Sequence, residues 1–95
     1  MPFGIISSGG NIVTANGGTG TVTKNTWAIS RIRWVSKSAS AGSSCVVKDA
    51  VGNIIFESNA TGADWQDETD LSKVSPIAGV QITTLSDGDV SFYLR

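Results

Sequence analysis

The sequence contains no histidine and only one cysteine, Cys45, among its 95 residues. Without histidine the usual general base is missing, and neither a Ser-His nor a Cys-His nucleophile pair can form. Cys45 lies in an apolar strand pattern, where a buried thiol is unreactive, and a lone cysteine cannot form an intrachain disulfide. Two carboxylates could still hydrolyse a glycoside, but so small a domain has little room for a substrate cleft. We therefore expect no enzyme activity and no cofactor.

An excess of positive charge and long hydrophobic runs are also absent. Seven lysines and arginines stand against eight acids, a net charge of −1, so no basic stripe favours nucleic acid. The apolar runs are far too short to cross a bilayer, and no charged segment precedes an apolar run at the N-terminus as in a secretory signal. We expect neither nucleic acid nor a membrane as a partner.

The residues that are present have the composition of short strands and tight turns. There are 11 glycines, and 40% of the residues are hydrophobic. The segment 26–58 organises the rest, because it holds Cys45, two of the three tryptophans and the densest run of β-branched residues. Turn signals and alternation predict strands over residues 3–6, 11–15, 19–24, 26–35, 45–47, 53–58, 77–85 and 89–95.

About eight short strands at this spacing predict one all-β domain over residues 1–95, a two-layer antiparallel β-sandwich that is jelly-roll-like. A small closed β-barrel is the alternative. The turn sequences Asn16-Gly17-Gly18 and Ser86-Asp87-Gly88 predict two hairpins. Residues 1–16 are predicted to be an N-terminal arm or edge strand, which could add a strand to the sheet edge of a neighbour.

The apolar phase of the segment 26–35 changes partway along. Trp27 and Ile29 share one side of a pleat, but by strict alternation the next pair, Ile32 and Trp34, shares the opposite side. A bulge between the pairs, near Arg31, brings both to the core, because one extra residue reverses the facing. The alternative is a strand with apolar groups on both faces.

The predicted core gathers the inward positions of these strands. Its members are Trp27, Ile29, Ile32, Trp34, Cys45, Val47, Ile54, Phe56, Val80, Ile82, Val90, Phe92 and Leu94. Each large side chain contributes roughly 1.5–3 kcal/mol on burial. Ordering the backbone costs about 1–2 kcal/mol per residue. The net stability left after these opposing contributions is small, so we expect further stabilisation from self-association as a homo-oligomer.

The candidate partner-binding residues are Trp65, Arg31, Arg33, Phe3 and Ile5. Trp65 lies in the acidic segment 64–70 and is interpreted as a plug at the end of the sandwich, a partner contact or a sugar platform. The same segment could offer oxygen ligands to Ca²⁺, but it lacks the spacing of an EF-hand loop, and a solvated loop is the favoured interpretation. Arg31 and Arg33 share a face, which is either solvated or a basic spot for an acidic groove.

Three segments carry a resemblance to a known group of proteins. They are the Trp/Ile strand 27–35, the hairpin 47–53 that continues into Ile-Ile-Phe-Glu-Ser, and the tail 79–95 with its Ser-Asp-Gly turn. The pattern resembles small virion proteins of tailed bacteriophages that decorate or cement a capsid or sit on a tail. The resemblance implies a β-sandwich, symmetric assembly with a trimer favoured, location in the virion, and binding to major capsid or tail subunits without catalytic residues.

The leading hypothesis is therefore a non-enzymatic structural or interaction protein of a virus particle. The alternative is a small carbohydrate-binding β-sandwich module that uses Trp65, Tyr93 and the nearby acids.

Overall fold

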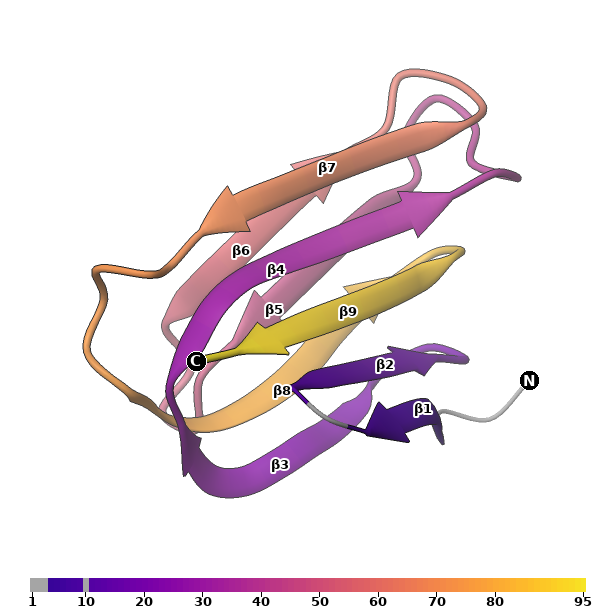
Figure 1. The fold of residues 1–95 in the computed structure, drawn as a ribbon. Coiled ribbons are helices and arrows are strands. Elements are labelled where there is room, and N and C mark those ends of the chain that lie inside the picture. The colour runs from indigo at the N-terminus through magenta and orange to yellow at the C-terminus, as the bar shows by residue number, and fades with distance from the viewer. Residues whose placement is uncertain (1–3, 10) are drawn as a thin grey trace.

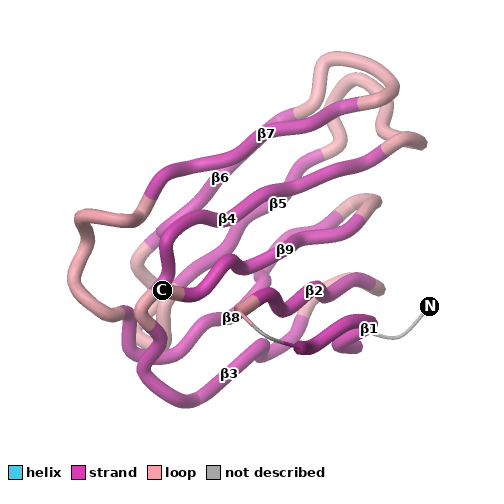
Figure 2. Tube along the Cα trace, viewed as in Figure 1, coloured by secondary structure: helices cyan, strands magenta, loops and turns pink. Residues whose placement is uncertain are grey.

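The structure, a computed structural model, describes residues 4–9 and 11–95 and contains strands but no helix within them (Figure 2). Most segments have the alternating pattern that gives a strand one buried and one open face. The strands are β1 (Gly4–Gly9), β2 (Ile12–Asn16), β3 (Gly20–Trp27), β4 (Ile29–Ser36), β5 (Ser44–Lys48), β6 (Ile54–Asn59), β7 (Trp65–Asp70), β8 (Ile77–Leu85) and β9 (Asp89–Leu94).

The strands form two antiparallel sheets that pack face to face (Figure 1). One has five strands in the order β1-β2-β9-β4-β7, and the other has four in the order β3-β8-β5-β6. Within the segment from β2 to β9, β2 pairs with β9, β3 with β8, β4 with β7 and β5 with β6. The first and third of these pairs lie in the five-stranded sheet, and the second and fourth lie in the four-stranded sheet. This is the topology of a jelly roll. The predicted sandwich is confirmed, and within the described residues it is not a closed barrel.

The two predicted glycine hairpins are wrong in one respect. Each turn reverses the chain, but β2 and β3 lie in different sheets, as do β8 and β9, so both turns are arches between the layers. Gly88 has φ +88°, and a Cβ there would lie 2.3 Å from the carbonyl oxygen of Val35. The indole N–H of Trp34 donates to the Asp87 carbonyl oxygen at 2.7 Å, which fixes the arch to the core. Turn chemistry specifies the reversal, whereas the pairing partner is set by distant strands.

The predicted bulge near Arg31 is confirmed. The register of β4 against β9 shifts between Ile29 and Arg31. As a result Ile29, Ile32 and Trp34 are all buried, with exposed fractions of 1%, 0% and 0%. The predicted single strand 26–35 is wrong, because Trp27 ends β3 in one sheet and Ile29 begins β4 in the other. Trp27 is partly buried, with its ring edge-on to Phe92 at a centroid distance of 6.2 Å.

Most of the predicted core is buried between the sheets, and Trp27 and Leu94 are partly buried against it. Ile54 was expected in the core but is 55% exposed. The reason is a second register shift, in which Val47 pairs with Phe56 but Lys48 pairs with Ile54. The extra residue, Ile55, reverses the facing of Ile54 and takes its place against the core.

The segment 59–75, for which a loop with a short strand is expected, contains such a strand, β7, which pairs with β4 over six residues without a register shift. Its burial alternates, with Gln66, Glu68 and Asp70 open to solvent. β7 is one edge of the five-stranded sheet and β1 is the other. Of the predicted arm, residues 4–9 and 12–16 are thus paired strands, while Phe3 lies outside the described residues.

Candidate interaction surface

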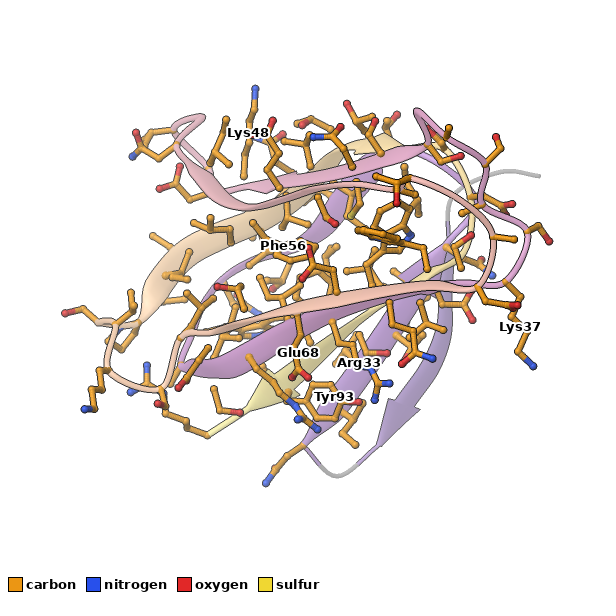
Figure 3. All side chains as sticks on the ribbon, turned by 90° about the horizontal axis from the view of Figure 1, so that it is seen from above. Arg33, Lys37, Lys48, Phe56, Glu68 and Tyr93 are labelled. Carbon is orange, nitrogen blue, oxygen red and sulfur yellow. The ribbon has the colours of Figure 1, made fainter. Side chains whose placement is uncertain are left out.

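The outer face of the five-stranded sheet gathers charged and aromatic side chains. Arg31 and Arg33 alternate with buried residues along β4, and they pair with Tyr93 and Ser91 on β9. Glu68 on β7 pairs with Arg33 from the other side. Figure 3 shows Arg33, Glu68 and Tyr93 together outside this sheet, Phe56 between the layers, and Lys48 projecting from the opposite face. The bulge in β4 is what directs both arginines outward.

The side chains on this face hold one another in place. The Arg31 Nη1 atom lies 3.2 Å from Glu68 Oε2, and the guanidinium carbon of Arg31 lies 4.1 Å from the centre of the Tyr93 ring. Arg33 donates a hydrogen bond to the side-chain oxygen of Gln66. Exposed ion pairs contribute only about 0–1 kcal/mol to stability. These contacts place both guanidinium groups beside partners on the neighbouring strands β7 and β9.

The face continues across β9 to β2. Tyr93 pairs with Ile12, which is 42% exposed. The hydroxyl oxygens of Thr14 and Ser91 lie 2.9 Å apart in a hydrogen bond. We call Ile12, Arg31, Arg33, Glu68 and Tyr93 the Tyr93 surface. It is an open area spanning four strands, with an apolar end, an aromatic centre and a charged end.

Trp65 does not belong to this surface. It pairs with Ser36, which is 1% exposed, and opposite residues of an antiparallel pair lie on the same face, so Trp65 faces inward and packs against the core. Its indole N–H donates to the hydroxyl of Ser58 at 3.0 Å, and that hydroxyl donates to an oxygen of Asp67 at 2.7 Å. We call Trp65, Ser58 and Asp67 the edge seal. It joins β7 to β6 at the open side of the sandwich, in agreement with the plug interpretation.

The other sequence-predicted residue of the arm, Ile5, also lies apart from the Tyr93 surface. It pairs with the fully buried Ala15, so it is on the inner face of β1, and it is 44% exposed. The structure therefore separates the candidates: Arg31 and Arg33 are together, whereas Trp65 and Ile5 lie at opposite edges of the same sheet.

The titratable and nucleophilic groups are dispersed. Burial raises the pKa of the Cys45 thiol to about 12, so it stays protonated at neutral pH. The acids of β7 alternate, with Asp67 turned inward and Glu68 and Asp70 outward. Within residues 4–9 and 11–95 no three metal-binding side chains converge at one point. The same residues include no helix of the length and hydrophobicity needed to span a membrane.

A shallow hollow of about 410 Å³ lies between the two interlayer arches. It is lined by Asn16, Asp87, Asp89 and the backbone of three glycines, among others. The side-chain nitrogen of Asn16 donates to Asp89 at 3.1 Å, and its side-chain oxygen is buried without a hydrogen-bond donor. The hollow is wide and open, and it is lined mainly by half-buried residues of the two turns.

Sequence reasoning placed Arg31 and Arg33 on one face, because alternation is a local signal. It missed Glu68 and Ile12 as their neighbours. Their place depends on the pairing of β7 with β4 and of β2 with β9, which join residues far apart in the chain.

Comparisons of this chain with models of protein families, with curated proteins and with solved structures found no match in any of the three.

Proposed function

We propose that this protein is a non-enzymatic structural or interaction protein of a virus particle, which binds coat or tail subunits through the Tyr93 surface. The arrangement of Arg31, Tyr93 and Glu68 on an open sheet face is the observation that carries the proposal. Jelly rolls occur in viral capsid and lectin domains, which agrees with the sequence resemblance, although a fold alone does not determine a function.

The Tyr93 surface has the composition of a protein-binding site. Tyrosine and arginine are enriched among the residues that carry most of the binding energy in interfaces. Arg31 is held between Tyr93 and Glu68 before any partner arrives, so less side-chain entropy is lost on binding. The balance of charge on this face, with Arg33 beside Glu68, suits a partner surface that carries both signs rather than a polyanion.

The buried thiol and the dispersed acids support a role in binding. A nucleophile needs an adjacent base and an accessible site, whereas Cys45 is fully buried within an apolar core. The self-association expected for so thin a core is part of the same proposal, with location in the virion.

The carbohydrate-binding alternative has less support from the geometry. A sugar platform requires an open aromatic face, whereas Trp65 faces inward and the guanidinium of Arg31 covers one face of the Tyr93 ring. A glycan array on the wild-type protein tests it, and a signal that Tyr93→Ala removes would favour the alternative.

The proposal is tested on particles produced by the genome that encodes this chain. We expect the wild-type protein to co-sediment with the particles through a density gradient, in fixed ratio to the coat or tail subunit. Tyr93→Ala and Arg31→Ala should reduce the affinity for particles at least about tenfold, or about 1.4 kcal/mol, because each removes a central contact.

Lys48→Ala is the matched control, because Lys48 lies on the outer face of the other sheet (Figure 3). It should bind particles as the wild type does. A wild-type chain that remains at the top of the gradient would contradict the proposal, and so would equal losses for Lys48→Ala and Tyr93→Ala.

A further inference from the structure

The free edge formed by β1 has none of the charges that usually protect an edge strand. The first charged residue of the whole sequence is Lys24, so β1 and β2 carry no charged side chain. An unpaired row of backbone N–H and C=O groups is a template for another strand, and charged side chains normally prevent such pairing. At the opposite edge, β7 carries Asp67, Glu68 and Asp70.

The inner side of β1 is also left partly uncovered. Ile5 faces the same side as the buried Ala15, yet its exposed fraction is 44%. An inward-facing isoleucine at a sheet edge is covered if the sheet continues, because the next strand places its own side chains on the same face. The feature therefore points to an added strand rather than to a small ligand.

We infer that a second copy of this chain pairs its β1 antiparallel to β1 of the first, across a two-fold axis, and joins the two five-stranded sheets into one. A second copy fits this edge because it supplies an uncharged strand of the same length and an Ile5 of its own. Pairing β1 with the partner's β7 instead would place Ile5 on the same face as the inward-turned carboxylate of Asp67.

The geometry limits the assembly to a dimer. A two-fold contact uses the same patch on both copies, so it closes on itself and leaves β7 of each copy free. A register shift between Ile5 and Ser7 confines regular pairing to short runs on either side of it, which keeps the contact small. The Tyr93 surface remains open, because it lies on the outer face rather than at the edge.

This inference rests on the self-association part of the proposed function and is independent of the Tyr93 surface. The mass of the wild-type protein in solution, measured by light scattering across a range of concentrations, should approach that of a dimer. Ile5→Lys should yield a monomer, because the two-fold axis brings the added charges of both copies together. Gly4→Lys is a second variant without steric conflict, since a Cβ at Gly4 meets no atom within 4 Å.

A mixing experiment identifies the partner strand. Ile5→Lys and Ile5→Glu should each be monomeric alone and should form a dimer when mixed in equal amounts. Gln66→Lys on β7, which adds the same charge at the opposite edge, is the matched control and should remain a dimer. Circular dichroism and thermal melting establish that each variant is folded.

Four results would overturn the inference. They are a monomeric wild type at every concentration, a wild-type trimer, which is the state that the resemblance implies, a dimer that Ile5→Lys leaves unchanged, and a higher mass for Ile5→Lys, as expected if β1 pairs with the acidic β7. Binding of Tyr93→Ala to particles is measured separately, so failure here leaves the proposed binding surface to be judged on its own result.

Discussion

The two edge strands of the five-stranded sheet, β7 and β1, differ in their charge and in how their inner faces are covered. At β7 the side chains close the sandwich: Trp65 and Asp67 turn inward to meet Ser58 of the other sheet, and acids face outward. The sequence of β1 contains no charged residue, and Ile5 is 44% exposed. The first edge is closed within one chain, whereas the second is arranged so that another chain can complete it.

This difference would let one sheet serve the two proposed contacts without conflict. An inward-pointing charge and an acidic row prevent strand addition at β7, so an added strand has only one edge of this sheet open to it. The Tyr93 surface lies between the edges and faces away from both. The comparison predicts that the edges differ in their contribution to stability, in their polar networks and in their response to acid.

The largest difference is expected from truncating the apolar residue at each edge. Trp65→Ala should destabilise the monomer by about 2–4 kcal/mol, because it removes a large ring packed on the core. Ile5→Ala should cost less than about 1 kcal/mol, since much of that side chain is already in water. Urea unfolding at a concentration where both variants are monomers measures the two values, and equal costs would contradict the comparison.

A smaller effect is expected from the polar part of the edge seal. Ser58 is 4% exposed, so Ser58→Ala leaves the indole N–H of Trp65 and an oxygen of Asp67 without their partner. The expected loss is about 1–3 kcal/mol. Ser91→Ala removes a hydroxyl pair on the open face, where water replaces the bond, and should cost about 0.5 kcal/mol. A Ser58→Ala variant as stable as Ser91→Ala would show that the seal is not closed in solution.

The smallest effect is expected from acid. The backbone N–H of Ser72 donates to Asp70 at the end of β7 and lowers the pKa of that carboxyl. A lowered pKa in the folded state gives stability that is present above the unfolded pKa and is lost as pH falls below about 4. Residues 4–23 hold no charged side chain, so the side chains of the β1 edge make no pH-dependent contribution to stability.

The pH dependence is measured by thermal melting of the wild type and of Asp70→Asn. The loss of melting temperature between about pH 5 and about pH 3 should be smaller in Asp70→Asn than in the wild type. Asp49→Asn is a parallel variant in the β5–β6 turn, because the backbone N–H of Asn53 lowers the pKa of Asp49. Identical acid profiles for wild type and Asp70→Asn would contradict the assignment.

Local patterns predicted the parts of the fold that local geometry determines. The phase change between Ile29 and Ile32 predicted the bulge, and with it the outward direction of Arg31. The turn at residues 86–88 was recognised, but its sequence reports a chain reversal and not the sheet in which the next strand pairs. The facing of Ile54 was missed because a one-residue bulge has no sequence signal of its own at that point.

The candidate site was predictable to the same extent. Arg31 and Arg33 could be placed on one face by alternation alone. The edge seal could not be predicted, because Ser58 and Trp65 belong to different sheets and meet only through the jelly-roll topology. A short strand was expected in the segment 59–75, but the bounds and pairing of β7 were obscured by polar residues at nearly every position, since its outer side is solvated and its inner side carries Asp67.

The most direct test is an electron cryomicroscopy reconstruction of the particle with this chain bound. The account predicts density for the jelly roll with the outer face of the five-stranded sheet against a coat or tail subunit, Tyr93 in the contact, and β1 beside β1 of a second copy. A particle without this density, or a chain bound through the outer face of the four-stranded sheet, would contradict it.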